Sequence, residues 1–182
     1  HFVRYADDCL IMVKSEKVAN RVMESITTFI TKKLGLKVNV EKSKIARPNN
    51  IKYLGFGFYK KINQNIWRPK PHIKSINKFK IKLRGILVRS KSISLDERLL
   101  KLKQIIYGWV NYFRIADMKM LLLREIDPWV RRKLRVIIWK QLKKIRRRYT
   151  CLRKLGISHR DAYVTANSRK GYYHIAHTRV IE

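Results

Sequence analysis

The amino-acid sequence predicts an α+β fold in residues 1–70, followed by an all-helical bundle in residues 71–182. Short apolar runs bounded by turn residues fill the first part, whereas apolar residues at helical spacing dominate the second. Pro69 and Pro71 stand where the pattern changes, so we place a domain boundary there. Hydrophobic residues make up 46% of the 182-residue chain, which is enough to form a core and argues against disorder.

The first part is expected to contain strands and one helix. Residues 2–13 form two short apolar segments with turn-forming residues between them, which is the pattern of a β-hairpin. Over residues 15–34, apolar side chains recur every three or four positions and predict a helix, with Gly35 as its C-cap. Further strands are predicted over residues 36–40 and 51–60.

The second part is expected to contain helices throughout. Residues 72–88 predict a basic helix, and residues 94–97 (Ser-Leu-Asp-Glu) form a capping box that begins the next one. Residues 127–145 predict a long helix, with an aspartate as N-cap and a proline at the first helical position. A serine cap predicts a final helix over about residues 158–168.

The strongest signal in the composition is charge. The chain has 44 Lys and Arg against 12 Asp and Glu, a formal net charge of +32. A charge of this size predicts a polyanionic partner, and nucleic acid is the usual one. An anionic membrane surface explains the charge less well, because the basic residues do not form one isolated amphipathic helix.

Other features concern the cellular compartment. No apolar run approaches the about 20 residues that a membrane helix needs, and no signal peptide is present. Cys9 and Cys151 lack metal-ligand spacing and predict buried, reduced thiols. We therefore expect no membrane partner and a protein of the bacterial cytoplasm or of an organelle that is not secreted. Because His1 opens the chain within a predicted strand, we also expect a longer parent protein.

Two neighbouring acidic residues, Asp7 and Asp8, stand between apolar segments of the first hairpin. Aspartate is common in hairpin turns, so the pair could be a structural turn. If the strands are buried, however, two ionised carboxylates there repel each other, and a divalent metal ion removes that repulsion. Paired carboxylates on a tight turn suit two-metal phosphoryl transfer.

Basic residues dominate the helical part, and no acidic residue occurs from Pro128 to Arg160. The repulsion among these bases lacks internal compensation, so we expect phosphates to supply it. Tyr172 and Tyr173 lie beside Arg169 and Lys170 and are candidates for stacking on unpaired bases. Trp109, Trp129 and Trp139 fall on apolar helix faces and are predicted to be core residues. The basic residues that we expect to bind RNA are Arg131, Arg132, Lys133, Arg135, Lys140, Lys143, Lys144, Arg146, Arg147, Arg148, Arg169 and Lys170.

The segment FVRYADD resembles the Tyr-x-Asp-Asp hairpin of reverse transcriptases. GLKVNVEKSK resembles the following polymerase motif, and YLGFGF the hairpin that grips the primer. IIYGWVNYFR, DPWVRRKLRVIIWKQLKK, LRKLG and SRKGYYHIA are similar to the thumb and maturase region of group II intron-encoded reverse transcriptases. The resemblance implies that residues 1–70 are the C-terminal part of a polymerase palm and that residues 71–182 are a thumb and maturase domain that binds RNA.

The resemblance also implies residue roles and a cofactor. Two Mg²⁺ ions are expected, with Asp7 as a metal ligand and Asp8 as its supporting neighbour. A further aspartate from an upstream strand would complete this site, so we expect residues 1–182 alone not to polymerise. The remaining expected catalytic and substrate-binding residues are Lys42 near the triphosphate, Tyr5 and Ala6 near the primer terminus and nucleotide, and Tyr53, Leu54, Gly55 and Phe56 at the primer.

The implied function is RNA-directed DNA polymerisation combined with binding and splicing of an intron. Expected partners are structured intron RNA, a template–primer duplex and deoxynucleoside triphosphates. A non-catalytic RNA-binding splicing cofactor remains an alternative, as do retron, CRISPR-associated and diversity-generating reverse transcriptases. A basic RNA-binding protein of the ribosomal type would explain the charge, but not the aspartate pair or the order of the motifs.

Overall fold

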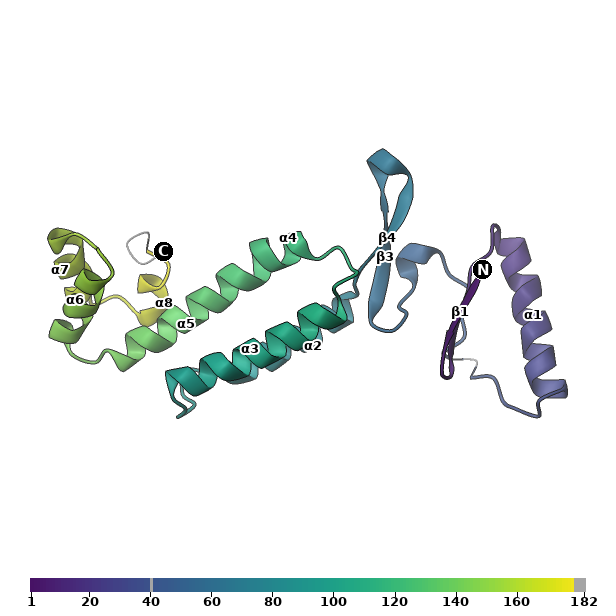
Figure 1. The fold of residues 1–182 in the computed structure, drawn as a ribbon, viewed down its shortest axis with the longest axis horizontal. Helices are drawn as coiled ribbons and strands as arrows, with labels where there is room; N and C mark the ends of the chain where they lie inside the picture. Colours follow the sequence, from purple (N-terminus) through teal and green to yellow (C-terminus); the bar gives the residue numbers. More distant parts are fainter. Residues whose placement is uncertain (40, 179–182) are drawn as a thin grey trace. The chain divides into compact units, whose positions relative to one another are not determined.

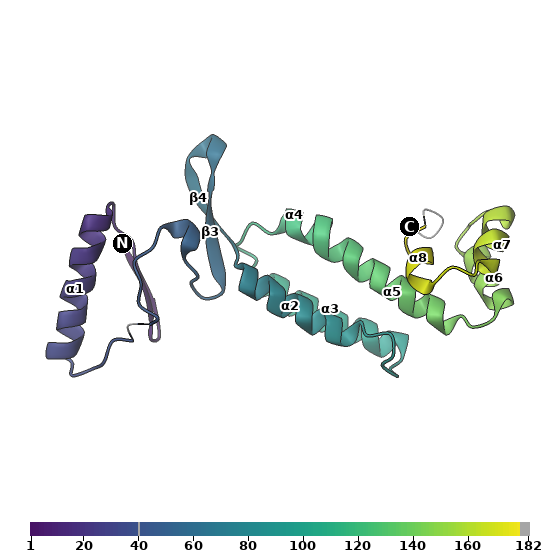
Figure 2. The same cartoon turned by 180° about the vertical axis from the view of Figure 1, so that it is seen from behind.

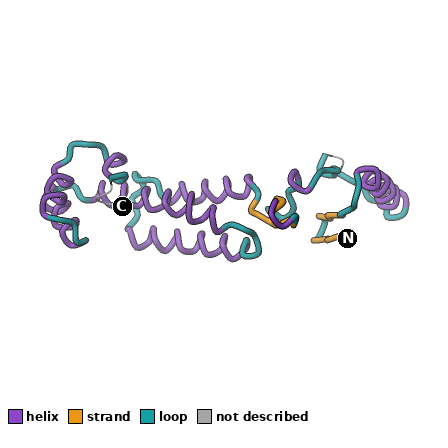
Figure 3. Tube along the Cα trace, turned by 90° about the horizontal axis from the view of Figure 1, so that it is seen from above, coloured by secondary structure: helices purple, strands orange, loops and turns teal. Residues whose placement is uncertain are grey.

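The computed structural model describes residues 1–39 and 41–178, and its fold is drawn in Figure 1 and, from behind, in Figure 2. The chain divides into two compact units, His1–Ile73 and Lys74–Glu182. Two small antiparallel hairpins lie in the first unit, and the described part of the second unit is helical (Figure 3). The predicted order of an α+β segment followed by an all-helical part is confirmed.

The first hairpin consists of strands β1 (Phe2–Tyr5) and β2 (Asp8–Ile11). The strands are antiparallel, and their register pairs Phe2 with Ile11 and Tyr5 with Asp8. Nearly every residue of both strands is exposed. The expectation of buried strands is therefore wrong for the described part of this chain, because no second layer of the chain covers either face.

Helix α1 (Glu16–Lys32) follows the hairpin, with both ends formed as expected. At its start, Ser15 Oγ accepts a hydrogen bond from the Val18 amide at 3.4 Å. At its end, Gly35 adopts a φ of 62°, a left-handed conformation that glycine adopts without steric penalty. The strand predicted next does not form over residues 36–39, where no partner strand pairs with the backbone. Val40, the last residue of that prediction, lies outside the described residues.

The second hairpin pairs β3 (Phe56–Lys61) with β4 (Ile66–Pro71). Two short 3₁₀ helices accompany it, η1 (Pro48–Asn50) before β3 and η2 (Ile62–Gln64) in the connection. The strand predicted over 51–60 thus begins five residues late, at Phe56. The reason is a tight turn, described with the site below, that reverses the chain just before β3.

The main core of the second unit is formed by α2 (Ile73–Ile86), α3 (Leu95–Tyr112) and α5 (Asp127–Gln141). The rings of Phe79 and Trp109 stack with their centroids 4.4 Å apart. Trp109 and Trp129 pack against this cluster, so their assignment to the core is confirmed. The buried members of the cluster are Phe79, Leu83, Ile86, Leu87, Leu102, Ile126, Val130 and Ile137.

Asp127 was predicted to be an N-cap, and this prediction is wrong. The helix begins earlier with α4 (Lys119–Leu121) and continues through the π-helical stretch η3 (Leu122–Ile126) directly into α5. Asp127 itself is helical, with φ −61° and ψ −50°. A proline inside an α-helix clashes with the carbonyl four residues before it. The wider π turn directly before Pro128 relieves that clash, so the chain passes the proline without ending the helix.

The long helix predicted through Ile145 is divided in two, because α5 ends at Gln141 and α6 (Ile145–Lys154) follows. Arg148 Nε donates a hydrogen bond to the Leu142 carbonyl at 2.7 Å, which satisfies a group that the break leaves without a helical partner. Leu142 also packs against a second core cluster. Tertiary contacts therefore stabilise a break at a sequence without glycine or proline.

The second cluster joins α5 and α6 to α7 (His159–Asn167) and α8 (Tyr172–Ile175). Trp139 is a buried member of it, as its assignment to the core predicted. Ser158 caps α7 as expected, since its Oγ accepts from the Asp161 amide at 3.1 Å. The cysteine prediction is wrong, because Cys9 is exposed and Cys151 is only half-buried.

Candidate catalytic hairpin and nucleic-acid interface

The two aspartates lie at the turn of the first hairpin. Ala6 and Asp7 form the two-residue connection between β1 and β2, and Asp8 is the first residue of β2. Ala6 adopts a φ of 49°, which is unusual for a residue with a Cβ. Arg4 Nε donates to the Ala6 carbonyl at 3.0 Å and so helps to hold this turn. Both carboxylates are exposed on a tight, braced turn.

Tyr53 connects this hairpin to the second predicted group of site residues. Its hydroxyl donates a hydrogen bond to the Asp8 carbonyl at 3.5 Å, although 45 positions separate the two residues. Partial burial raises the pKa of Tyr53, and the neighbouring Asp8 and Cys9 raise it further. The structure thus brings together the aspartate hairpin and the segment expected at the primer.

The segment expected at the primer is itself a tight turn. The Tyr53 amide donates to the Phe56 carbonyl at 3.0 Å, and the Phe56 amide donates to the Tyr53 carbonyl at 2.8 Å. Between them, Leu54 and Gly55 adopt φ values of 47° and 83°. A leucine with positive φ is rare, and such strain is concentrated at functional sites. This turn continues directly into β3.

Lys42 lies apart from these contacts, in an exposed turn after α1. Its amide donates to Asn39 Oδ1 at 3.1 Å. Among the described residues, no interaction joins Lys42 to Asp7 or Asp8. The structure therefore holds Lys42 through its backbone and leaves its ammonium group in solvent.

The carboxylates of Asp7 and Asp8 have the ligand chemistry that Mg²⁺ prefers. Their number is too small, because a Mg²⁺ site needs near-octahedral coordination by several oxygen atoms. Within residues 1–39 and 41–178, no group of three or more His, Cys, Asp or Glu side chains lies close enough together to hold a metal ion. The described residues thus fit part of a metal site and not a whole one.

The basic residues of the second unit fall into two groups. Some bind within the fold: Arg131 pairs with Asp127 at 2.8 Å, Arg132 donates to the Pro128 carbonyl at 3.2 Å, and Arg135 donates to the Ala176 carbonyl at 3.3 Å. These contacts stabilise α5 and hold the segment after α8. The exposed group, which presents its charge to solvent, consists of Lys140, Lys143, Lys144, Arg146, Arg147, Arg169 and Lys170. Lys133 is half-buried.

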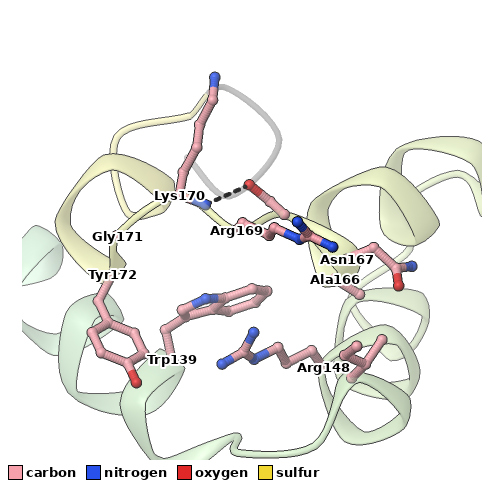
Figure 4. Close-up of a pocket in the computed structure, with 10 residues that line it drawn as sticks. Trp139, Arg148, Ala166, Asn167, Arg169, Lys170, Gly171 and Tyr172 are labelled. Atoms are coloured by element: carbon pink, nitrogen blue, oxygen red, sulfur yellow. Dashed lines mark hydrogen bonds between the residues drawn. The ribbon is translucent and has the colours of Figure 1, made fainter.

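The two tyrosines of the last motif have different surroundings. Tyr172 is half-buried and packs against the second core cluster, whereas Tyr173 is exposed and its ring centroid lies 4.1 Å from that of His177. Tyr172 also lines a cavity together with Arg148, Arg169 and Lys170 (Figure 4). Asn167 and Ser168 line the same cavity and were not predicted. Their position directly before Arg169 and Lys170 was the one signal that could have suggested them.

Comparison with known protein families matches both parts of the chain. Residues 1–58 match the family model for reverse transcriptase (RNA-dependent DNA polymerase), and residues 76–156 match the model for the group II intron, maturase-specific domain. A comparison with curated proteins found no match. No helix in the described part of the chain is both long enough and apolar enough to cross a membrane. The two matches occur in the order that the motifs predicted, and the chain belongs to the family of group II intron-encoded reverse transcriptases and maturases.

Proposed function

We propose that the protein serves RNA-directed DNA synthesis through its first hairpin and intron RNA binding and splicing through its helices. The observation that carries the polymerase part is the pair of adjacent carboxylates on a braced turn, in a chain with only 12 acidic residues. A purely structural turn does not need two neighbouring charges. The basic helices support the RNA-binding part, because exposed cations without acidic neighbours attract phosphate groups.

In this proposal, residues 1–70 act as part of a polymerase palm and residues 71–182 as a thumb and maturase domain. Asp7 and Asp8 would hold Mg²⁺, which when bound activates the attacking hydroxyl and stabilises the leaving pyrophosphate. Tyr5 and Ala6 would lie at the primer terminus and nucleotide. Tyr53 to Phe56 would bind the primer, and Lys42 would approach the triphosphate of the incoming deoxynucleotide.

We further propose that residues 1–182 alone do not polymerise. The two carboxylates need another acidic ligand to complete a metal site, and the described residues do not supply it. A primer-extension assay on this chain should therefore yield no cDNA. Synthesis by the chain alone would contradict the proposal.

The decisive test of the catalytic role uses a protein that joins this chain to the rest of a polymerase palm. Asp7→Ala should abolish cDNA synthesis, while RNA binding and splicing remain unchanged because the basic helices are untouched. Glu24→Ala, which removes an exposed carboxylate from α1, is the matched control and should retain synthesis. Loss of splicing along with synthesis in Asp7→Ala would show that the two roles are not separate.

A non-catalytic splicing cofactor is the second candidate function. The exposed bases of the second unit favour it, because they need no metal site to bind RNA. In that case the protein with the joined palm would promote splicing, and neither it nor Asp7→Ala would make cDNA. In either case, we propose action in the bacterial cytoplasm or in an organelle.

A further inference from the structure

A cavity of about 530 Å³ lies in the second unit, between the end of α5, the start of α6 and the connection from α7 to α8. Its volume falls within the range of small-ligand sites. Figure 4 shows it, and no carboxylate lines it among the described residues. The side chains and backbone that line the cavity belong to Trp139, Ile145, Arg148, Ala166, Asn167, Ser168, Arg169, Lys170, Gly171 and Tyr172.

One side of the cavity combines a fixed cation with an aromatic ring. The Arg148 guanidinium carbon lies 5.2 Å from the centroid of the Trp139 ring, within the range of a cation–π contact. The hydrogen bond from Arg148 Nε to the Leu142 carbonyl holds the guanidinium in this position. The guanidinium retains further N–H groups, which suit a phosphate.

The opposite side is the connection between α7 and α8. The Lys170 amide donates to Ser168 Oγ at 3.3 Å, which orders this connection. Arg169 extends along the cavity towards Asn167 in Figure 4, whereas the Lys170 ammonium points away from the other lining side chains. Arg169 is therefore the exposed cation of the cavity, and Tyr172 supplies a second aromatic ring.

A smaller cavity of about 340 Å³ has the same chemistry, since Arg84, Arg89, Lys133 and Trp129 are among the residues that line it. The Arg89 guanidinium carbon lies 6.0 Å from the centroid of the Tyr172 ring, so a residue of one cavity contacts a residue of the other. Helix α5 contributes to both, through Trp129 and Lys133 in one and Trp139 in the other. The two cavities thus form neighbouring cationic and aromatic sites.

We propose that the larger cavity binds one unpaired nucleotide of RNA, with its base against the aromatic walls and its flanking phosphates on Arg148 and Arg169. The chain would then continue towards the smaller cavity past Arg89 and Tyr172. A bare phosphate needs no aromatic walls, and a paired base cannot leave its stack to enter a cavity without unstacking. This inference rests on the RNA binding proposed above and specifies what is recognised.

The test compares three hairpin RNAs in binding to the full chain: one fully paired, one with a single bulged nucleotide, and one with an abasic residue at the bulge. The bulged hairpin should bind about tenfold more tightly than the other two, which is the order of one base–aromatic stack. Arg169→Gln should reduce this ratio towards one. Arg147→Gln is the matched control, since Arg147 is exposed on α6 and lines neither cavity. It should weaken the binding of all three RNAs equally and keep the ratio.

Each outcome has a definite meaning. Equal binding of the paired and bulged hairpins would overturn the nucleotide site while leaving general RNA binding intact. Equal binding of the abasic and bulged hairpins would also overturn it, because the base would then contribute nothing. If none of the three RNAs bound, the proposed RNA-binding function would fail as well.

Discussion

Arg98 is a charged side chain in the core of the second unit, only 1% exposed. It lies near the start of α3, and its guanidinium donates hydrogen bonds to the carbonyls of Ile86, Val88 and Lys91. These carbonyls belong to the end of α2 and the loop that follows, where the helix dipole favours a positive charge. The three charge-assisted bonds offset the desolvation of the guanidinium and connect α2 to α3.

Arg98→Met should therefore lower the free energy of unfolding by about 3 kcal/mol, because it leaves buried carbonyls without donors. Chemical denaturation followed by circular dichroism measures this change. Arg114→Met, at an exposed position, is the matched control and should stay within about 0.5 kcal/mol of the parent. Equal effects of the two substitutions would show that the buried contacts contribute little.

Glu97 and Lys101 form an ion pair one turn apart on α3. The hydrogen bond from Lys101 and its charge lower the pKa of Glu97. A carboxyl with a lowered pKa stabilises the fold above its unfolded pKa, and this contribution is lost as the pH falls through the folded pKa. Lys101→Met should raise the pKa of Glu97, as followed by NMR titration of its carboxyl carbon. An unchanged pKa in this variant would contradict the assigned cause.

At the scale of elements, two helix starts that look alike in sequence differ in structure. Ser94 is a true N-cap, and its Oγ accepts from the Glu97 amide at 3.1 Å. Asp127 lies inside a continuous helix, where it pairs with Arg131 on the surface. A cap satisfies a backbone donor that otherwise has no partner, whereas an exposed ion pair contributes little.

The expected result is that Ser94→Ala costs about 1 kcal/mol of folding free energy and Asp127→Ala less than about 0.5 kcal/mol. The two variants serve as controls for each other in the same denaturation experiment. A loss for Asp127→Ala as large as that for Ser94→Ala would mean that the helix begins at Asp127 after all.

At the scale of the whole molecule, the two units differ in how much apolar surface they bury. The buried apolar side chains among the described residues extend from Phe79 to Ala176, all in the second unit. In the first unit, α1 has no buried residue, and Phe2 and Tyr5 are 70% and 65% exposed. Since burial of apolar surface is the dominant stabilising term, the second unit should be the more stable.

Hydrogen exchange measured by mass spectrometry should therefore show fast exchange in α1 and slow exchange in α3 and α5. The protection of core amides in α3 should exceed that in α1 on the order of 100-fold. Comparable protection in both helices would contradict the proposed difference. Such a result would indicate that α1 is covered by something that this chain does not contain.

The outcome of the sequence predictions follows from the range of the interactions involved. The caps at Ser15, Ser94 and Ser158 formed as expected, because a cap depends on residues three positions apart. The predictions failed at Pro128 and at the break near Leu142, where a π turn and a distant arginine satisfy the backbone. Of the candidate site, the aspartate turn was recognisable from its motif, but the cavity was not.

The sequence by itself determined the hairpin of Asp7 and Asp8, the family and the cationic character, because motifs and net charge are properties of residue order and composition. Only the tertiary structure decided that Tyr53 contacts Asp8, that Arg98 is buried, and that Trp139, Arg148 and Arg169 surround one cavity. These contacts join residues from different elements, and most of them lie far apart in the chain. Their formation depends on how whole elements pack and which polar groups that packing satisfies, which local patterns do not specify.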